Sequence, residues 1–317
     1  MKMKITIIGP PAFGYTKYIY DSLKKIEQVE VNIFYIDRST FKYKNKAHKI
    51  KNFLLKIFFG VNLKKKYQDD IVKDSIKALG GQDFIFTIRP DLLKNKTLAV
   101  LKSSAKHNIA FYYDSITRFS RKGDILPYFD KVYSYDKEDI EVHGFDFLTN
   151  YIYQESNITQ HEYIFFNISS YDFRFKSLDK LAKYINDKGW SSKILVHHPD
   201  ESIEKSEYLE IINQIKSVSE INDLMKHSKI IIEIQRNDQI GLSFRIFEAL
   251  GHNKKLITTN KDIVNYDFYN PQNILVIDEN YIEIPEDFVN TPYQPVDEAI
   301  LDKYRIDNWV KPIFNLE

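Results

Sequence analysis

The sequence predicts two α/β domains in tandem, each built on a parallel, doubly wound β-sheet. The chain has 317 residues, which is enough for two cores of ordinary size. Short apolar runs alternate with amphipathic stretches along the whole length, as expected for strands joined by crossover helices. The alternation loosens once, at 150–162, where NYIYQESNITQHE is rich in polar residues. We therefore expect a first domain at 1–155, a second at 156–296 and a terminal segment at 297–317.

The first domain opens with a strand, a loop, a helix and a second strand, which is the βαβ unit of a parallel sheet. Strands are expected where short apolar runs end at glycine, proline or charged residues: 4–8, 29–36, 83–88, 109–113 and 132–135. Helices are expected where apolar residues recur every three or four positions: 15–26, 92–107 and 137–142. Open α/β sheets place their chemistry at the carboxyl ends of strands. Asp114 follows a predicted strand directly, so it is either a functional carboxylate or the cap of the next helix.

The second domain repeats the alternation of strand and helix. Strands are expected at 163–167, 193–197 and 273–277, and helices at 175–188, 206–216 and 219–227. Between 230 and 260 a strand, a loop, a helix and another strand follow one another. Three prolines make 285–296 extended. The last part, 297–314, has the spacing of a helix, with Ile300, Tyr304 and Trp309 on one side.

The stretch IIIEIQRNDQIGLSFRIFEALGHNKKLITTN, at 230–260, carries the most informative pair of charged residues. Arg245 and Glu248 are three positions apart and share one helical face. Arg245 is expected in the first helical turn, where the helix dipole disfavours a cation. A bound anion would reverse that penalty, because the free N–H groups and the guanidinium would hold it together. Glu248, one turn deeper, could accept both hydroxyls of a ribose. The same spacing also fits a surface ion pair on a core-facing helix.

The composition excludes several classes of protein. A net charge of +1 argues against a general nucleic-acid binder. The absence of cysteine excludes disulfides, thiolate metal sites and a cysteine nucleophile. No apolar run is long enough for a signal peptide or approaches the ~20 residues of a membrane span, so we expect a cytoplasmic protein. There is no Asp-x-Asp motif and no histidine pair at i, i+4 spacing, so we expect neither a metal nor another cofactor.

The stretch 41–66 combines nine lysines with a row of apolar residues at helical spacing. The apolar row consists of Ile50, Phe53, Leu54, Ile57 and Phe58. One interpretation is a helix packed on the sheet, with its lysines in solvent. The other is an interfacial helix attracted to anionic lipid, by roughly 1 kcal/mol per basic residue near the surface. The second interpretation predicts contact with the inner face of the cell membrane.

The segment GLSFRIFEALGHNKKLITTN resembles the donor-binding helix and following strand of GT-B glycosyltransferases. FYYDSITRF and YFDKVYSYDKEDIEVHGF are similar to the first domain of the same families. The resemblance is strongest to bacterial enzymes that build capsule, exopolysaccharide or lipopolysaccharide, and to the CgeB-like group. It implies a GT-B fold of two Rossmann-like domains with a cleft between them. It also implies that a C-terminal helix in 297–317 crosses back to pack on the first domain.

The resemblance implies roles for individual residues in binding a nucleotide-sugar. In those families the glutamate of a phrase like R-x-x-E-A-L binds the ribose of the donor, and here that glutamate is Glu248. Arg245, Ser243 and backbone N–H groups at the helix start would bind phosphate. Arg174, in the loop after the first strand of the second domain, would bind the diphosphate, unless it forms a surface salt bridge.

The implied activity is metal-independent transfer of a sugar to a surface polysaccharide that is linked to a lipid. Gln239 and Gly241 would shape the loop that approaches the donor. If the reaction inverts configuration, Asp114 is the expected general base, with Asp136 and Asp139 as weaker candidates; a retaining reaction requires none.

Two other classes of protein stay open. One is a non-catalytic GT-B-like module that binds a glycan or a partner glycosyltransferase. The other is a sugar-nucleotide epimerase of related fold.

Overall fold

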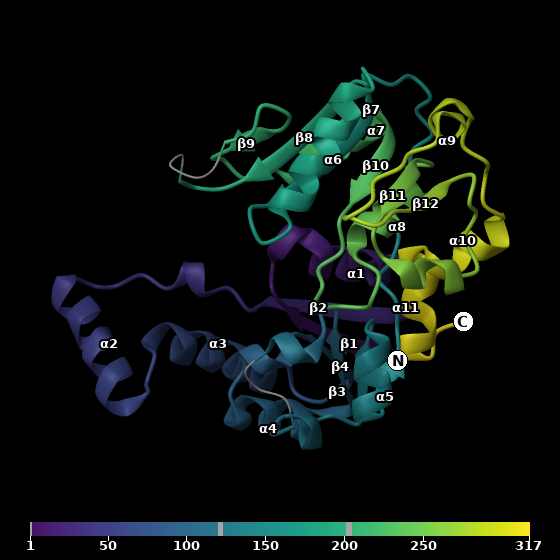
Figure 1. Ribbon diagram of the computed structural model, residues 1–317. Helices are drawn as coiled ribbons and strands as arrows, with labels where there is room; N and C mark the ends of the chain where they lie inside the picture. Colours follow the sequence, from purple (N-terminus) through teal and green to yellow (C-terminus); the bar gives the residue numbers. More distant parts are fainter. Residues whose placement is uncertain (1, 120–122, 201–204) are drawn as a thin grey trace. The chain divides into compact units, whose positions relative to one another are not determined.

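The protein, seen in a computed structural model, consists of two compact units (Figure 1). The structure describes residues 2–119, 123–200 and 205–317. Unit 1 comprises 1–148 together with 310–317, and unit 2 comprises 149–309. Each unit contains one six-stranded sheet, and the paired strands in both sheets are parallel. Parallel sheets are covered on both faces, which explains the continuous apolar runs that mark the strands in the sequence.

The sheet of unit 1 has the strand order β2-β1-β3-β4-β5-β6. Its strands are β1 (Met3–Gly9), β2 (Val29–Tyr35), β3 (Gln82–Ile88), β4 (Ala105–Tyr112), β5 (Lys131–Ser134) and β6 (Asp146–Phe147). The first five confirm the predicted strands, and the short β6 was not predicted. Strand β1 has β2 on one side and β3 on the other, so the order reverses there, as in a doubly wound sheet. Ile7 and Phe86 are paired across β1 and β3, and both are fully buried.

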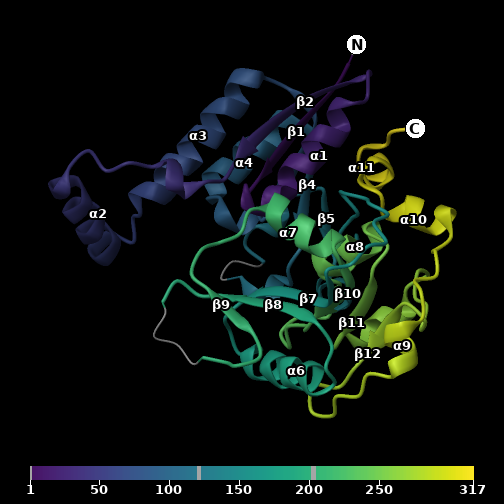
Figure 2. The same cartoon turned by 90° about the horizontal axis from the view of Figure 1, so that it is seen from above.

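Most helices of unit 1 bury an apolar side against this sheet. The helices of unit 1 are α1 (Tyr15–Lys24), α2 (Lys46–Phe59), α3 (Leu63–Leu79), α4 (Asn95–Ser104) and α5 (Lys137–His143). Helix α4 ends earlier than predicted, because Ala105 already pairs with β3 as the first residue of β4. Helix α2 is the exception, since Asn52 is its one buried residue. Both views show α2 standing away from the sheet of unit 1 (Figures 1 and 2).

The sheet of unit 2 has the strand order β12-β11-β10-β7-β8-β9. Its strands are β7 (Tyr163–Ser170), β8 (Ser192–His197), β9 (Glu210–Ile212), β10 (Ser228–Glu233), β11 (Lys255–Thr258) and β12 (Ile274–Val276). Numbered from the start of the unit and read from β9, this is the order 3-2-1-4-5-6 of dinucleotide-binding sheets. The order reverses between β7 and β10. Sheets of this kind bind ligands at the carboxyl ends of the strands beside that reversal.

Helices cover both faces of this sheet. They are α6 (Phe175–Asp187), α7 (Val218–Lys226), α8 (Phe244–Gly251), α9 (Glu286–Asn290), α10 (Glu298–Tyr304) and α11 (Ile306–Phe314). Phe165 and Phe166 are neighbours in β7, and their side chains belong to different apolar cores, because successive side chains of a strand point to opposite faces. Helix α11 begins in unit 2, and its last residues from Val310 onward belong to unit 1.

One predicted helix of unit 2 is wrong. Residues 206–216 contain the edge strand β9 instead, in which Ile211 and Ile212 pair with Val196 and His197 of β8. The β-branched side chains of two consecutive isoleucines favour a strand. Because β9 is only partly buried, it lacks the continuous apolar run that identifies the inner strands.

The C-terminal part of unit 2 contains more separate helices than the sequence predicts. The segment 285–296, expected to be extended, contains the short helix α9. The helix expected at 297–314 is broken at Arg305, whose backbone is extended with φ −64° and ψ 133°. Arg305 pairs there with Ile152 in a β-bridge, and its guanidinium binds Glu155 at 2.9 Å. The Ile152 N–H donates to the Tyr304 carbonyl at 2.8 Å, and the Ile306 N–H donates to the Ile152 carbonyl at 2.9 Å, so the backbone on both sides of Arg305 bonds a segment about 150 residues away.

Candidate functional site

The residues that the sequence singles out in the second domain gather at the carboxyl ends of β7 and β10. Arg174 lies in the loop after β7, at the N-cap position of α6. The loop after β10 leads into α8. The order of the sheet reverses between these two strands, which makes this edge the expected ligand-binding edge. The predicted residues found at this edge are Arg174, Gln239, Gly241, Ser243, Arg245 and Glu248.

Arg245 and Glu248 form an ion pair within helix α8. The helix begins at Phe244 with Ser243 as its N-cap, so Arg245 lies in the first turn as predicted. Its Nη1 atom is 2.8 Å from Oε2 of Glu248. Glu248 is only 6% exposed, and its Oε1 atom accepts a hydrogen bond from the hydroxyl of Tyr153. The carboxylate of the pair is therefore buried, while the Arg245 side chain is 18% exposed, so the pair does not lie in the open surface as the alternative interpretation expects.

The Arg245 guanidinium is also fixed by the elements around α8. Its Nη1 atom is 2.9 Å from the sulfur of Met225 in α7, and its Nη2 atom is 3.4 Å from the carbonyl oxygen of Ile168 in β7. Arginine has five N–H donors in a rigid fork. These contacts hold the fork at the edge of the sheet between β7 and α7.

A second buried carboxylate, Glu233, ends strand β10. It accepts hydrogen bonds from the hydroxyls of Thr258, at 2.7 Å, and Ser243, at 3.1 Å. Ser243 therefore binds Glu233 with its side chain and makes no side-chain cap of α8. Burial raises the pKa of Glu233, while the two hydroxyls and the charges of Arg174 and Arg245 act in the opposite direction. These contacts tie β10, β11 and the start of α8 together.

Arg174 belongs to a network that joins the loops after β7 and β10. Its Nε and Nη2 atoms donate to Oδ1 and Oδ2 of Asp172, at 2.9 and 2.8 Å, and its Nη1 atom donates to the Ile234 carbonyl at 3.0 Å. Arg236 donates to the same Asp172 at 3.0 Å and also pairs with Asp238. Burial opposes ionisation of Asp172, but the hydrogen bonds and charges of the two arginines lower its pKa below the usual value. Arg174 does form a salt bridge, within this network and only partly exposed.

Side-chain amides hold the loop before α8 through hydrogen bonds to its backbone carbonyl groups. The amide of Gln235 donates to the carbonyls of Gln239, at 3.2 Å, and Gly241, at 3.1 Å. The amides of Asn260 and Asn150 hold two further carbonyls of this loop, each at 3.0 Å. Gln239 and Gly241 thus take part in the loop through their backbone, and four side-chain contacts fix its path.

Four residues of this edge were not singled out by the sequence: Asp172, Glu233, Arg236 and Tyr153. Glu233 carried a signal, because a carboxylate at the end of the apolar run IIIEI is unusual for a buried strand. Arg236 follows it in the same segment. Tyr153 gave no signal, because it lies in the polar stretch that we read as a domain boundary.

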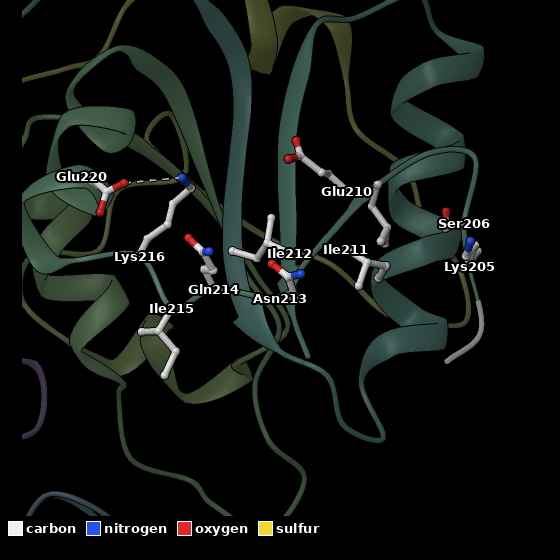
Figure 3. A pocket seen from close by; sticks show the side chains of 11 residues that line it. Lys205, Ser206, Glu210, Ile211, Ile212, Asn213, Gln214, Ile215, Lys216 and Glu220 are labelled. Carbon is white, nitrogen blue, oxygen red and sulfur yellow. Dashed lines mark ion pairs between the residues drawn. The ribbon is translucent and has the colours of Figure 1, made fainter. Parts of the chain in front are cut away.

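A cavity of about 610 Å³ opens beside the edge strand β9 (Figure 3). Its lining includes Ile212, Asn213 and Gln214, and Lys216 forms an ion pair with Glu220 at 3.7 Å. The carboxyl end of β9 lies at the same edge of the sheet as those of β7 and β10, because the strands are parallel. The volume is in the range of small-molecule sites.

Asp114 lies in unit 1, directly after β4 and its neighbour Tyr113. Its Oδ1 atom accepts a hydrogen bond from Nη1 of Arg118 at 2.8 Å, and its side chain is 25% exposed. The N-cap of the short turn that follows is Ser115, whose hydroxyl accepts from the backbone of Thr117. The cap position predicted as the alternative role for Asp114 is therefore taken by Ser115.

Asp136 and Asp139, the other carboxylates considered as a base, have structural roles. Both are 1% exposed. Asp136 caps α5, and its side chain accepts a hydrogen bond from the backbone of Glu138. Asp139 accepts hydrogen bonds from the hydroxyl of Ser134 at 2.7 Å and from the backbone of Ile116 at 2.9 Å. Burial raises the pKa of Asp139 in spite of these bonds. Asp114 is the most accessible of the three.

Two kinds of feature are absent from the part of the chain that the structure describes. No three or more histidine, cysteine, aspartate or glutamate side chains are grouped so that they could hold a metal ion. No helix combines the length and the apolar character needed to cross a membrane. Arg174, Arg236 and Arg245 supply positive charge at this edge of unit 2.

His252 lies buried at the end of α8 and makes the stability of unit 2 depend on pH. It is 1% exposed, and its Nδ1 atom is 2.9 Å from the hydroxyl of Ser156. Burial lowers the pKa of His252 to about 4, and nearby positive charges act in the same direction. In the unfolded chain the imidazole takes up its proton near the ordinary pKa of ~6.5. The stability from neutral His252 is therefore present above that pH and is lost as the pH falls toward 4.

We expect the variant His252→Gln to lose less stability on acidification than the wild type. Glutamine keeps a hydrogen-bonding group for Ser156 but does not titrate. Between about pH 7.5 and pH 5 the wild type should lose about 2 kcal/mol more, because one pKa unit corresponds to ~1.4 kcal/mol. Urea denaturation of both proteins at the two pH values measures this difference. Equal losses in the two proteins would contradict the assignment to His252.

Comparison with known proteins defines the class to which this fold belongs. No protein-family model matches the sequence, and no curated protein matches it. Among solved structures, an α-glucosyltransferase in complex with UDP and DNA matches with a TM-score of 0.59 at 11% identity, over 100% of this chain and 96% of that chain. The chain therefore has the GT-B fold of two Rossmann-like domains, and the predicted fold class is confirmed.

Two further structures show the same fold. A UDP-forming α,α-trehalose-phosphate synthase from Burkholderia xenovorans matches with a TM-score of 0.55 at 10% identity, over 99% of this chain and 98% of that chain. A UDP-GlcNAc 2-epimerase from Methanocaldococcus jannaschii matches with a TM-score of 0.52 at 11% identity, over 99% of both chains. At these identities the similarity establishes the fold, and function has to be argued from the site.

Proposed function

We propose that the protein is a glycosyltransferase that takes a sugar from a nucleotide-sugar donor bound in unit 2. The observation that carries the proposal is the ion pair of Arg245 with the buried Glu248 in α8, at the carboxyl edge beside the reversal of the sheet. A ligand that offers an anion to the guanidinium and hydroxyls to the carboxylate fits this pair. Proteins named for sugar transfer with UDP share the fold, which supports the choice of reaction.

Different charged residues at this edge would bind the ribose and the two phosphates of the donor. Glu248 would bind the ribose hydroxyls. Arg245, Ser243 and the first N–H groups of α8 would bind one phosphate, since a helix N-terminus favours an anion. Arg174 would bind the other, while Gln239 and Gly241 keep the loop in place. Positive groups fixed before the reaction stabilise the charge that develops on a leaving diphosphate.

The transfer itself would use Asp114 as general base. Its carboxylate accepts the proton of an acceptor hydroxyl as that oxygen bonds to the anomeric carbon. The bond from the anomeric carbon to the diphosphate oxygen breaks, and the nucleoside diphosphate leaves with the electron pair. This is the inverting course of the reaction; a retaining course would not need Asp114.

The acceptor in this proposal is a growing surface polysaccharide carried on a lipid. The support is the resemblance of the segment at 241–260 to enzymes that build capsule, exopolysaccharide or lipopolysaccharide. We propose that the reaction needs no metal, because arginines can supply the positive charge. The protein would act in the cytoplasm on the inner face of the cell membrane, which it would reach through the basic stretch 41–66, and nucleic acid would not be its acceptor.

An epimerase acting on a sugar nucleotide is the second candidate function. The observation in its favour is the shared fold of the UDP-GlcNAc 2-epimerase. An epimerase needs acid and base groups beside the sugar. The accessible carboxylate Asp114 lies in unit 1 with Arg118 as its partner, which suits a single base better than an acid–base set. A non-catalytic module that binds a glycan or a partner glycosyltransferase would keep the donor edge without turnover.

A thermal-shift screen with UDP, GDP, CDP, ADP, TDP and CMP, with and without magnesium, tests the donor site. A ligand at 100 times its dissociation constant stabilises the folded state by about 2.7 kcal/mol. We expect one base to respond, equally with and without magnesium. The sugar nucleotide of that base is then incubated with and without a membrane extract that supplies the acceptor. Release of nucleoside diphosphate only with the extract supports transfer. An epimerised donor supports the second candidate, and binding without turnover supports a binding module.

A further inference from the structure

One face of helix α2 is the largest exposed apolar feature of unit 1 among the described residues. Six large apolar side chains of this helix are between 46% and 73% exposed. In sequence order they are Ile50, Phe53, Leu54, Ile57, Phe58 and Phe59, and we call the first five the α2 apolar face. The first five recur at three- and four-residue spacing and so form one stripe along the helix. Exposed apolar patches of this kind mark sites of interaction.

The orientation of α2 is set by its opposite side. Asn52 is buried, its Oδ1 atom accepts from the backbone of Leu63 at 2.8 Å, and its Nδ2 atom donates to the hydroxyl of Tyr43 at 2.7 Å. Gly60 ends the helix in a left-handed conformation, with φ 62°, which lets the chain turn into α3. The residues before α2 and the start of α3 therefore hold the polar side, and the apolar face points away from them. The interpretation of this stretch as a helix packed on the sheet is wrong.

Lysines flank the apolar face on both sides. At 100° per residue, Lys51 lies on one side of the stripe and Lys49 and Lys56 lie on the other, and all three are exposed. The stretch 41–66 contains nine lysines, and no acidic residue occurs from 38 to 68. An apolar stripe between basic flanks is the pattern of a helix that lies in a membrane interface.

We propose that α2 inserts its apolar face into the surface of an anionic bilayer, while the flanking lysines bind lipid phosphates. This assigns the proposed membrane contact to one helix and to named side chains. It concerns unit 1 alone and does not rest on the sugar-transfer activity. A lipid surface is the partner that satisfies both properties of α2. Nucleic acid would bind the lysines and leave the phenylalanines in water, and a second copy of α2 would bring lysines against lysines.

Flotation of the full chain with lipid vesicles tests the proposal. We expect binding to vesicles of phosphatidylcholine with about a third of phosphatidylglycerol, and little binding to phosphatidylcholine alone. The triple variant Phe53→Ser, Ile57→Ser, Phe58→Ser should lose at least about tenfold in partition, because apolar area drives insertion. A matched control changes three exposed apolar residues elsewhere, Val142→Ser, Val264→Ser and Tyr281→Ser, and should bind as the wild type does.

Charge reversal separates the contribution of the lysines to vesicle binding from that of the apolar side chains. Lys49→Glu, Lys51→Glu, Lys56→Glu should abolish the preference for anionic vesicles. The control Lys24→Glu, Lys25→Glu, Lys77→Glu changes the net charge equally at exposed lysines elsewhere in unit 1 and should retain it. Thermal shift with the responding nucleotide monitors unit 2 in every variant. Unchanged nucleotide binding with lost vesicle binding separates this inference from the proposed catalytic function.

Insertion can be located with a single cysteine, because the chain has none of its own. An environment-sensitive fluorophore on Phe58→Cys should shift to the blue on anionic vesicles, and the same label on Val142→Cys should not. Vesicle binding that survives the Phe53→Ser, Ile57→Ser, Phe58→Ser variant would overturn the proposal. So would a dimer that dissociates in that variant without lipid, or tight binding to duplex DNA that is lost only on charge reversal.

Discussion

Replacing Asp114 by asparagine is expected to abolish sugar transfer and to leave nucleotide binding unchanged. Asparagine cannot accept a proton at neutral pH, and the loss of a general base lowers the rate by about 10²–10⁴-fold. Its amide oxygen can still accept the hydrogen bond that Arg118 donates to Asp114 at 2.8 Å, so the loop after β4 should keep its conformation. Initial rates at saturating donor measure transfer, and calorimetry with the nucleoside diphosphate measures binding.

The control for Asp114 is a carboxylate in a similar pair at another place in unit 1. Asp21 is bonded to Lys17 at 2.5 Å with the same spacing of four residues in sequence. Asp21→Asn should leave transfer unchanged, because a surface ion pair contributes ~1 kcal/mol or less to stability. If Asp114→Asn transfers sugar at the wild-type rate, Asp114 is not the base and the retaining course becomes the better description.

The inner elements of both sheets could be predicted from the sequence, and the edge elements could not. An inner parallel strand is buried on both faces and appears as a continuous apolar run, as with β3 and β10. Strand β9 is three residues long and partly exposed, and β6 has two exposed residues. Their pairing depends on a neighbouring strand that is distant in sequence, so the local pattern carries too little information.

The same distinction holds for the candidate site. Arg245 and Glu248 could be paired from the sequence because one helical turn fixes their separation. Arg236 and Asp172 are 64 positions apart, and Tyr153 and Glu248 are 95 apart, so only the fold brings these groups together. The orientation of α2 is a further case. Its amphipathic pattern was visible, but the hydrogen bonds of Asn52 determine which side faces the chain.

Glu248→Gln is expected to weaken binding of the nucleoside diphosphate by roughly 1.5–3 kcal/mol, the usual contribution of hydrogen bonds to a charged group. This corresponds to about 10–150-fold in the dissociation constant. Glutamine has nearly the same shape but offers a single acceptor oxygen, so it cannot hold two ribose hydroxyls and Arg245 together. Calorimetry on the wild type and the variant measures the change, and urea denaturation shows whether the variant remains folded.

A control for Glu248 is an arginine-paired glutamate elsewhere in unit 2. Glu298 forms an ion pair with Arg305 at 2.7 Å, and Glu298→Gln should not change nucleotide affinity. If Glu248→Gln binds the nucleotide as tightly as the wild type does, the ribose is held elsewhere. The Arg245–Glu248 pair is then only structural.

Tyr153 tests the same site from the other direction. Its hydroxyl occupies Oε1 of Glu248, so an incoming ribose has to share that oxygen with Tyr153 or displace it. Tyr153→Phe removes the competing donor, and affinity for the nucleotide should stay equal or rise while Glu248→Gln lowers it. These different changes in nucleotide affinity separate a direct ribose contact from a loss of local structure. A general loosening around α8 would lower the affinity of both variants. A fall in both, at unchanged stability toward urea, would instead place the Tyr153 hydroxyl among the groups that bind the ligand.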